Sequence, residues 1–320
     1  MNQKLKLIVS GSPHLKNNVK TPHIMRDVII GLLPAVAASI YFFGIGAVIL
    51  IFNCTITAVA TEKIINKIRK QKSTIGDYSA VVTGILVALI LPVSIKWYGA
   101  TLGTIFAILV GKHLFGGLGS NIFNPALLGR AFLAAAYPKM LTTYTEPGQF
   151  DTITQATPLM LQKFSGQTTS LGKLFLGNTS GSLGETSAIC LLIGGVYLLL
   201  RKSAGWRIPL SLLISLSLAS TIGYLINPDL GTPIFHLLAG GLFLGAFFMA
   251  TDPATTPVTK KGKFIFGAIC GILIMIIRYF SNLPEGVMYS ILFVNATVPL
   301  INLYTRPKSF GQRRNDERSS

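Results

Sequence analysis

Apolar runs of roughly 18 to 20 residues recur along the whole chain, and they constrain its fold more than any other feature. A helix needs about 20 apolar residues to cross about 30 Å of hydrocarbon. In lipid, backbone N–H and C=O groups must be satisfied within the segment, so these runs form helices rather than open strands. Only 12% of the 320 residues are charged, whereas a soluble domain has about 25%. The sequence therefore predicts an all-α polytopic membrane protein.

The hydropathy pattern predicts about ten transmembrane helices, five on each side of a long polar interval at 139–183. The expected spans are 27–44, 45–61, 77–95, 98–115, 121–138, 184–200, 208–226, 233–250, 264–280 and 286–304. An odd number of crossings in each half orients the two halves oppositely, which is the arrangement of an inverted repeat. "NPALLGRAFLAAAYPK" (124–139) and "NATVPLINLYTRPK" (295–308) are similar and occupy corresponding places.

These observations divide the chain into five parts. They are a cytoplasmic tail (1–26), a first five-helix repeat (27–138), an extracytoplasmic loop (139–183), a second five-helix repeat (184–304) and a basic cytoplasmic tail (305–320). The orientation comes from the basic residues, because cytoplasmic loops collect Lys and Arg. With the amino terminus inside, 22 basic residues face inward and 4 outward. The net charge of +17 is thus explained by inner loops facing cytosol and anionic lipid, without nucleic acid.

Few residues of the spans point to chemistry. The acidic residues fall at predicted span ends or in loops, whereas proton-coupled carriers usually place ionisable groups within the membrane. Arg130 is the most deeply placed charge, and it either pairs near an interface or contacts an anionic cofactor or partner. The three cysteines lie in apolar runs without a CxxC pattern, and the four histidines lack metal-ligand spacing. We therefore expect no metal site formed by this chain alone.

Glycines and prolines interrupt several apolar runs. "FGGLGSNIFNPALLG" (115–129) opens the fifth predicted span, and "TDPATTP" (251–257) follows the eighth. Small residues let helices approach closely, and they also let a planar ligand lie against the backbone. A broken helix exposes backbone groups that only a neighbour or a cavity can satisfy. Binding of a planar ligand near 115–129 is one interpretation, and helix packing alone is the other.

The polar strip "FDTITQATPL" (150–159) stands out in the outer interval. It contains Asp151, Thr154, Ala156 and Thr157 in the pattern D-x-x-T-x-A-T. The chemistry alone indicates a hydroxyl beside a small residue, followed by a proline that keeps the preceding backbone extended. The pattern resembles the acceptor signature for covalent flavinylation, in which a flavin transferase joins FMN to the last Thr or Ser. Gln155 stands where that signature usually has Gly.

The wider chain is similar to the NqrB/RnfD family of membrane subunits. The matching pieces are "SPH" (12–14), "MRDVIIGLLPA" (25–35), "GDYSAVVTGILVALILP" (76–92), "NIFNPALLGRAF" (121–132) and "FMATDPATTPVTKKGK" (248–263). Members serve in Rnf complexes and in sodium-pumping NADH:quinone reductases. The latter usually have a longer amino-terminal region, so the Rnf type is favoured here.

The resemblance implies an electron-relaying membrane subunit of an ion-translocating ferredoxin:NAD oxidoreductase, not catalytic alone. It implies covalent FMN on Thr157, with a second non-covalent flavin such as riboflavin left open. The expected partners are Rnf subunits of the A, B, C, E and G types, a flavin transferase and the lipid of a bacterial or archaeal cytoplasmic membrane. The coupling ion, Na⁺ or H⁺, is not fixed by the sequence.

Three other interpretations stay open. The chain could be an NqrB-type subunit of a Na⁺-pumping NADH:quinone reductase, because both types share the family's motifs. It could instead be a stand-alone channel or carrier for a small solute, because an inverted repeat with broken helices is typical of transporters. A purely structural membrane subunit would make the threonine motif a coincidence. The presence or absence of a covalent flavin on Thr157 separates the carrier and the structural subunit from the first interpretation.

Overall fold

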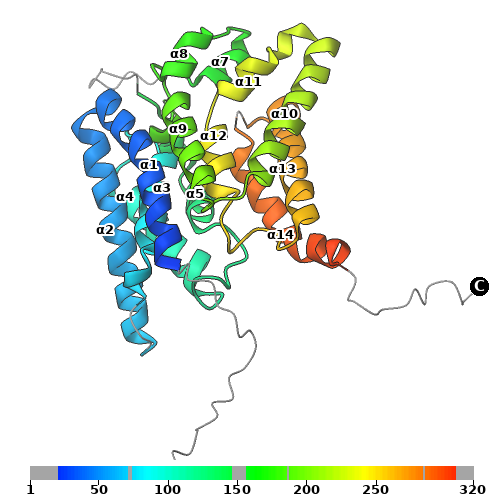
Figure 1. Ribbon diagram of the computed structural model, residues 1–320. Coiled ribbons are helices and arrows are strands. Elements are labelled where there is room, and N and C mark those ends of the chain that lie inside the picture. The colour runs from blue at the N-terminus through cyan, green and yellow to red at the C-terminus, as the bar shows by residue number, and fades with distance from the viewer. Residues whose placement is uncertain (1–20, 71–73, 146–155, 186, 284, 308–320) are drawn as a thin grey trace, which may run out of the picture.

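The computed structural model describes residues 21–70, 74–145, 156–185, 187–283 and 285–307. These residues form helices joined by loops, with no strand among them (Figure 1). The longer helices are α1 (Thr21–Phe43), α2 (Ile45–Ile68), α3 (Ser79–Ile90), α4 (Trp97–Phe106), α5 (Pro125–Ala136), α9 (Ala188–Leu200), α10 (Arg207–Ile226), α13 (Lys260–Phe280) and α14 (Val287–Thr305). The short ones are α6 (Pro138–Leu141), α7 (Pro158–Ser165), α8 (Leu171–Leu176), α11 (Pro233–Leu238) and α12 (Leu242–Leu244). The predicted all-α class is confirmed.

Within the described residues, five helices are long and apolar enough to cross a membrane: α1, α2, α10, α13 and α14. A sixth span arises if residues 228–238 and 242–249 count together, since they are bent by 50° at a short break. The apolar helices α3, α5 and α9 are shorter, with 12, 12 and 13 residues. The predicted count of ten crossings and the inverted repeat therefore stay predictions, as does the five-part division of the chain.

Two helices end in π-helical turns, and these lie in the middle of the molecule. α4 continues as η2 (Ala107–His113), and α12 continues as η5 (Gly245–Met249). Asn124, the N-cap of α5, donates from Nδ2 to the carbonyl oxygen of Met249 at 3.3 Å. The Asn295 amide accepts from the Asn124 N–H at 3.1 Å and donates to the Thr255 carbonyl oxygen at 3.3 Å. These side chains satisfy backbone groups that the broken helices leave free.

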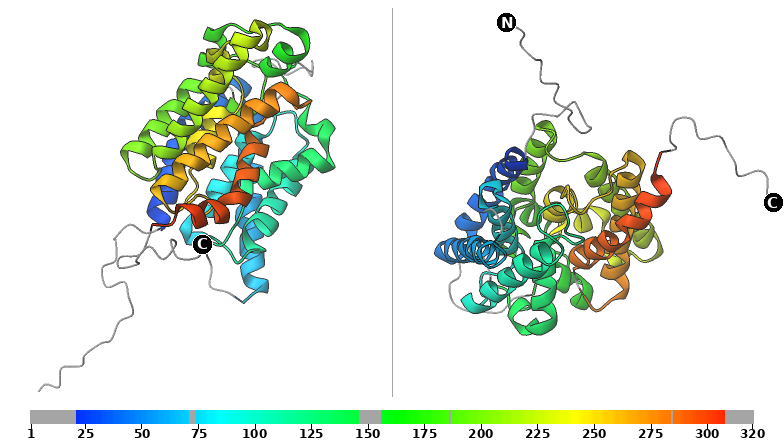
Figure 2. Two further views of the ribbon diagram at one scale, coloured as in Figure 1. Left: turned by 90° about the vertical axis from the view of Figure 1, so that its right-hand side faces the viewer. Right: turned by 90° about the horizontal axis from the view of Figure 1, so that it is seen from below.

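Glycines set the closest helix contacts. A Cβ atom on Gly271 of α13 would lie 2.4 Å from the Leu212 carbonyl oxygen of α10, and one on Gly267 would lie 2.5 Å from that of Ile208. Such small residues let transmembrane helices pack backbone to backbone. Figure 2 shows α1 and α2 on one flank and α13 and α14 on the opposite one, with α12 between them.

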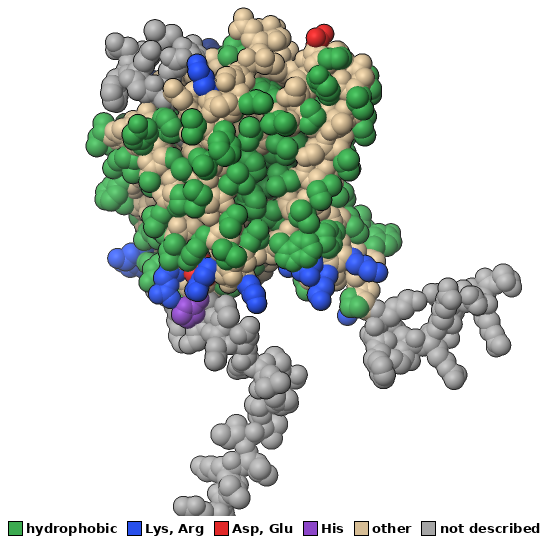
Figure 3. All heavy atoms as spheres, turned by 45° about the horizontal axis from the view of Figure 1, so that its top comes forward, with side chains coloured by type: hydrophobic (Ala, Val, Ile, Leu, Met, Phe, Trp, Pro, Cys, Tyr) green, Lys and Arg blue, Asp and Glu red, His purple; other side chains and the backbone are tan. Residues whose placement is uncertain are grey.

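The outer surface carries an apolar belt with a basic edge. Figure 3 shows hydrophobic side chains over the wall of the molecule and Lys and Arg side chains along its lower rim. α1 begins and α14 ends at this rim, whereas α7, α8 and α11 lie at the opposite end (Figure 1). Half-exposed and exposed apolar side chains on a helical wall are expected where lipid, not water, is the solvent.

Two helices extend beyond the predicted spans. The second span was expected to end at 61 and a basic loop to start with Glu62, but α2 continues to Ile68. Glu62 is therefore inside a helix and fully buried, where it pairs with Lys112 at 2.8 Å. The helix continues because the ion pair removes the cost of an isolated buried carboxylate. Likewise α1 begins at Thr21, inside the predicted tail.

Candidate functional site

Thr157 lies at the start of α7, at the end of the molecule opposite the basic rim (Figure 1). Its hydroxyl oxygen accepts the N–H of Met160 at 3.3 Å, so Thr157 is the N-cap of α7. The residue is only 4% exposed. Asp151, Thr154 and Gln155 of the acceptor pattern lie outside the described residues. The structure thus gives the predicted acceptor hydroxyl a defined place, but it does not test whether that hydroxyl carries a flavin.

Two polar side chains anchor the far end of α7. Gln162 donates from Nε2 to the Asp229 carbonyl oxygen at 2.9 Å. Lys163 donates from Nζ to the carbonyl oxygens of Arg278 at 2.6 Å and of Leu283 at 3.2 Å, and also to that of Ser281. A cation is favoured at the end of a helix, where carbonyl groups are left without partners. We call this contact of Lys163 with the end of α13 the α7 latch.

A buried ionic cluster lies beside α7. Arg130 of α5 pairs through Nη2 with Glu285 Oε2 at 2.8 Å and through Nη1 with Glu185 Oε1 at 3.8 Å. Ser182 donates its hydroxyl to Glu185 Oε1 at 2.6 Å. The side chains of Arg130, Glu185 and Glu285 are only 11%, 7% and 16% exposed. Of the two interpretations of Arg130, pairing near an interface is the one these contacts support.

A cavity of about 100 Å³ connects this cluster with α7. It is lined by Arg130, Ala134, Leu141, Thr142, Tyr144, Met160, Leu283, Glu285, Met288 and Tyr289. Met160 is the residue whose N–H the Thr157 hydroxyl accepts. On the other side, a Cβ atom on Gly240 would meet Leu159 Cδ1 at 2.8 Å, Arg278 Nη2 at 3.4 Å and Glu285 Oε1 at 3.5 Å. The first turn of α7 and the ionic cluster therefore line the same cavity and have Gly240 as a common neighbour.

Arg278 of α13 completes the surroundings of the cluster. Its guanidinium donates to the carbonyl oxygens of His236 at 2.6 Å and Ala239 at 2.9 Å, at the end of α11. These carbonyls are free because the helix breaks between α11 and α12. Arg278 is 4% exposed, so its charge is held within the protein and not toward lipid. One charged side chain thus closes the broken helix and supplies positive charge near Glu285.

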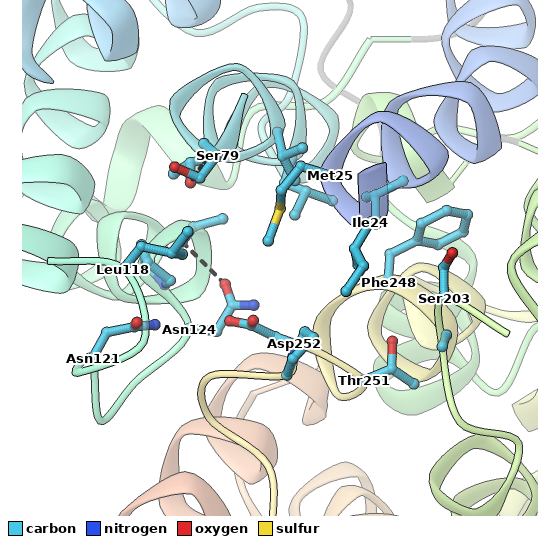
Figure 4. Close-up of a pocket in the computed structure, with 18 of the residues that line it drawn as sticks. Ile24, Met25, Ser79, Leu118, Asn121, Asn124, Ser203, Phe248, Thr251 and Asp252 are labelled. Atoms are coloured by element: carbon cyan, nitrogen blue, oxygen red, sulfur yellow. Dashed lines mark hydrogen bonds between the residues drawn. The ribbon is translucent and has the colours of Figure 1, made fainter. Parts of the chain in front are cut away.

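A second pocket is lined in part by Ile24 and Met25, near the start of α1 (Figure 4). Its cavity of about 60 Å³ is walled by α1, α3, α5, α9 and η5. Asn121, Asn124, Asp252, Ser203, Thr251 and Ser79 are its labelled polar residues in Figure 4. Asn124 faces the pocket from the glycine-rich segment singled out at 115–129. Leu118, Asn121 and Asn124 of this segment thus line the pocket.

A larger cavity of about 290 Å³ adjoins this pocket, because Lys112 and Leu118 line both. Its other lining residues are Thr21, Asn66, Thr74, Asp77, His113, Gly116 and Gly117. Two buried atoms here, Asn66 Oδ1 and His113 Nε2, have no hydrogen-bond partner within the described part of the chain. Buried polar atoms are normally satisfied, so these two are suited to a polar ligand or water.

Comparison with known proteins decides the family. The model of the NQR2, RnfD, RnfE family matches residues 8–311. The chain belongs to this family. It is 45% identical over 316 residues to the D-type component of the Na⁺-translocating ferredoxin:NAD⁺ oxidoreductase complex of Acetobacterium woodii, with 97% of each chain covered. It is 41% identical to the D-type component of the proton-translocating complex of Clostridium ljungdahlii, with 96% of each covered.

A third member of the NQR2, RnfD, RnfE family is more distant. The D-type component of the ion-translocating oxidoreductase complex of Escherichia coli O127:H6 is 36% identical, with 96% of this chain and 99% of that one covered. The first two relatives are named for different ions, Na⁺ and protons. The relatives thus belong to one class of complex, but family membership does not determine the coupling ion of this chain.

The sequence pointed to the polar strip at 150–159 and to the glycine-rich segment at 115–129. It did not reveal the ionic cluster. Glu185 and Glu285 were expected only as residues at span ends or in loops. Their partner Arg130 is separated from them by 55 and 155 positions along the chain. The signal that could have pointed to the cluster was a carboxylate at the start of each of two predicted spans, in a chain with only 11 acidic residues. No local pattern pairs such residues.

Proposed function

We propose that this chain is the membrane subunit of an ion-translocating ferredoxin:NAD oxidoreductase of the Rnf type, carrying covalent FMN on Thr157 and relaying electrons. The observation that carries the proposal is the near full-length similarity to the D-type components of such complexes, in a chain whose acceptor-like motif ends at a structurally defined threonine. The other subunits of the complex and a flavin transferase are its partners. Ferredoxin and NAD chemistry belongs to those other subunits.

The surroundings of Thr157 fit a phosphodiester. The hydroxyl oxygen lies at the N-terminus of the eight-residue helix α7, where backbone N–H groups and the helix dipole favour an anion. Esterification keeps that oxygen in place as an acceptor for the Met160 N–H. FMN when bound supplies a redox centre. The residues of this chain hold it: Thr157 attaches it, and the α7 latch of Lys163 fixes the helix that carries it.

The pocket lined by Asn121 and Asn124 supports the second, non-covalent flavin. Amide and hydroxyl groups can donate to and accept from the polar edge of an isoalloxazine ring. Together with the adjoining cavity, the pocket reaches the lower end of the range of about 300–1,000 Å³ for small-molecule sites. Extraction of the purified complex with denaturant should release free riboflavin or FMN, and a denatured supernatant without flavin argues against this part of the proposal.

The proposed location is a bacterial or archaeal cytoplasmic membrane, with both termini and the basic rim in the cytoplasm and Thr157 outside. The 22-to-4 distribution of Lys and Arg supports this orientation. The position of α7 at the end opposite the rim agrees with it. Flavin transferases of this kind act outside the cytoplasmic membrane, as the family resemblance implies, so the motif and the charge pattern point the same way.

Co-expression with a flavin transferase tests the attachment. The denatured polypeptide should show in-gel flavin fluorescence, and the peptide containing Thr157 should gain the mass of FMN less water. The Thr157→Ala variant should lose both signals, whereas Thr157→Ser should keep them because serine offers the same hydroxyl. Thr142→Ala is the matched control, since Thr142 is an exposed threonine of the same outer interval. Fluorescence that persists in Thr157→Ala would move the attachment elsewhere.

The rival functions make different predictions in the same preparation. A stand-alone carrier or channel would move a solute into liposomes that contain this chain alone, with no flavin. A purely structural subunit would show neither flux nor a covalent mass addition. An NqrB-type subunit would carry the flavin but co-purify with a quinone-reducing complex instead of a ferredoxin-oxidising one.

A further inference from the structure

Ionisable side chains from separate parts of the chain meet beside α7. Arg130 comes from α5, and Arg278 from α13. Glu185 lies just before α9, and Glu285 just before α14. The groups that face the two carboxyls are Arg130, Tyr144, Ser182, Arg278 and Tyr289, with the Gly241 N–H. The family resemblance implies no role for this cluster. Its side chains are far more buried than those of a solvated loop.

The two carboxyls have unequal surroundings. Glu285 has the short contact with Arg130, at 2.8 Å, and Glu185 has only the longer one, at 3.8 Å. Burial, and then the negative charge of Glu285, raise the pKa of Glu185 well above its usual range. Burial is the largest influence on Glu285 and opposes its ionisation, but Arg130, Glu185, Arg278 and the Gly241 N–H together outweigh it and lower the pKa of Glu285. Two buried carboxyls with such unequal surroundings can hold one proton between them.

The cluster and the first turn of α7 line one cavity. Met160 lines the cavity that Arg130, Tyr144 and Glu285 also line. Leu159 and Glu285 Oε1 both lie within 3.5 Å of the same Cβ position on Gly240. Glu285 Oε1 has no hydrogen-bond partner within the described residues, so it can accept a proton without losing a bond. A charge added near the first turn of α7 therefore acts on this pair across protein, not bulk water, and is weakly screened.

We propose that Glu185 and Glu285 form a proton-binding site whose affinity depends on the redox state of the flavin carried by Thr157. This inference rests on the proposed function. An electron from a reduced iron–sulfur donor adds one negative charge to the flavin. The pair then binds one proton from the adjoining aqueous side, forming a carboxyl O–H bond while hydronium gives up that proton. When the electron leaves the flavin, the proton is released, and charge balances in both directions.

A purely structural ion cluster would behave differently. Its carboxyls would stay ionised beside Arg130 and Arg278 at neutral pH, and their charge would not change with flavin redox state. The buried cluster would then stabilise the fold without contributing to the pH dependence of the flavin potential. The two roles are therefore separated by measuring protonation and potential, not by activity.

The test uses the purified complex, first checked for in-gel flavin fluorescence so that loss of the flavin is detected separately. The midpoint potential of the covalent flavin is measured by redox titration over a range of pH. We expect it to fall with rising pH in the wild type and to fall less steeply in Glu185→Gln, which keeps the shape but cannot ionise. Asp229→Asn, at an exposed acidic residue near α7, should keep the wild-type slope.

Infrared difference spectra between oxidised and reduced protein give the second readout. A protonated-carboxyl C=O band should change on reduction, shift in D₂O and be absent from the Glu185→Gln spectrum. Equal pH slopes in wild type and Glu185→Gln, with the flavin present in both, would overturn the proton site while leaving the proposed function intact. A complex without covalent flavin would overturn both. If Glu185→Gln prevents assembly, Glu285→Gln and Ser182→Ala provide the same comparison, since Ser182 donates to Glu185.

Discussion

Arg130 carries the positive charge at the centre of the buried ionic cluster. It lies in an apolar helix and pairs with two carboxyls from distant parts of the chain. Removing one member of a buried ionic group costs more than the group contributes, because it leaves an uncompensated charge. In the sequence, Arg130 suggests a site for an anion. In the structure, its counter-charges are Glu185 and Glu285 of the same chain.

Replacement of Arg130 by Met should destabilise the protein by about 3–5 kcal/mol, the usual cost of breaking a buried ion pair from one side. Thermal unfolding in detergent measures it. The loss should grow as pH rises, because Glu185 and Glu285 then ionise without their counter-charge. Arg201→Met is the control, since Arg201 is 60% exposed and lies 3.5 Å from Asp27, and exposed pairs contribute little. Equal losses in both variants would contradict the assignment of Arg130.

At the scale of single elements, the placement of α7 depends on contacts that no local pattern encodes. Helix start signals predict its first turn: Thr157 caps it and Pro158 follows. Its docking comes from Gln162 and Lys163, which reach backbone carbonyls more than 60 positions away. Backbone acceptors carry no sequence signature, so the α7 latch was not predictable from the sequence.

The Lys163→Met variant should loosen α7 while preserving its apolar length. We expect a loss of about 1–2 kcal/mol, since a charged donor contributes more than a neutral one but this site is partly exposed. Hydrogen–deuterium exchange of the peptide 158–165 should become faster. Lys173→Met in α8 is the matched control, because Lys173 is exposed. Unchanged exchange in Lys163→Met would show that apolar packing alone holds the helix.

The close contact between helices α10 and α13 depends on glycine residues. Gly271→Ala would place a methyl group 2.4 Å from the Leu212 carbonyl oxygen and 2.1 Å from Ser215 Oγ. The helices must separate, and overpacking of this kind costs about 1–3 kcal/mol. Gly205→Ala is the control, because a Cβ atom there meets no other atom within 4 Å. Detergent unfolding of both variants tests the contact, and a neutral Gly271→Ala would contradict it.

For the whole molecule, the sequence predicted the all-α class and the family, because hydropathy acts over whole segments and the family's motifs occur along nearly the whole chain. It did not predict which helices are long. α3, α5 and α9 are short where spans of 17 to 19 residues were expected. Helix breaks follow from tertiary contacts such as Asn124 with Met249, and hydropathy averages across them.

Single cysteines test the orientation of the molecule in a background without Cys54, Cys190 and Cys270. Thr142→Cys lies in the outer interval and Lys202→Cys at the basic rim, and both positions are exposed. In intact cells a membrane-impermeant maleimide should label Thr142→Cys at once. It should label Lys202→Cys only after permeabilisation. The opposite pattern would invert the topology that the charge distribution predicts.

The buried N-cap of α7 has a consequence for biogenesis. With Thr157 only 4% exposed and the far end of the helix bound by Lys163, the flavin transferase of the proposed function would reach the Thr157 hydroxyl only before this helix docks. Maturation would then be ordered in time, with the prosthetic group added first and the helix closing afterwards. A copy in which α7 docks before the flavin is attached could no longer be modified, and the cell would accumulate a stable subunit that cannot relay electrons.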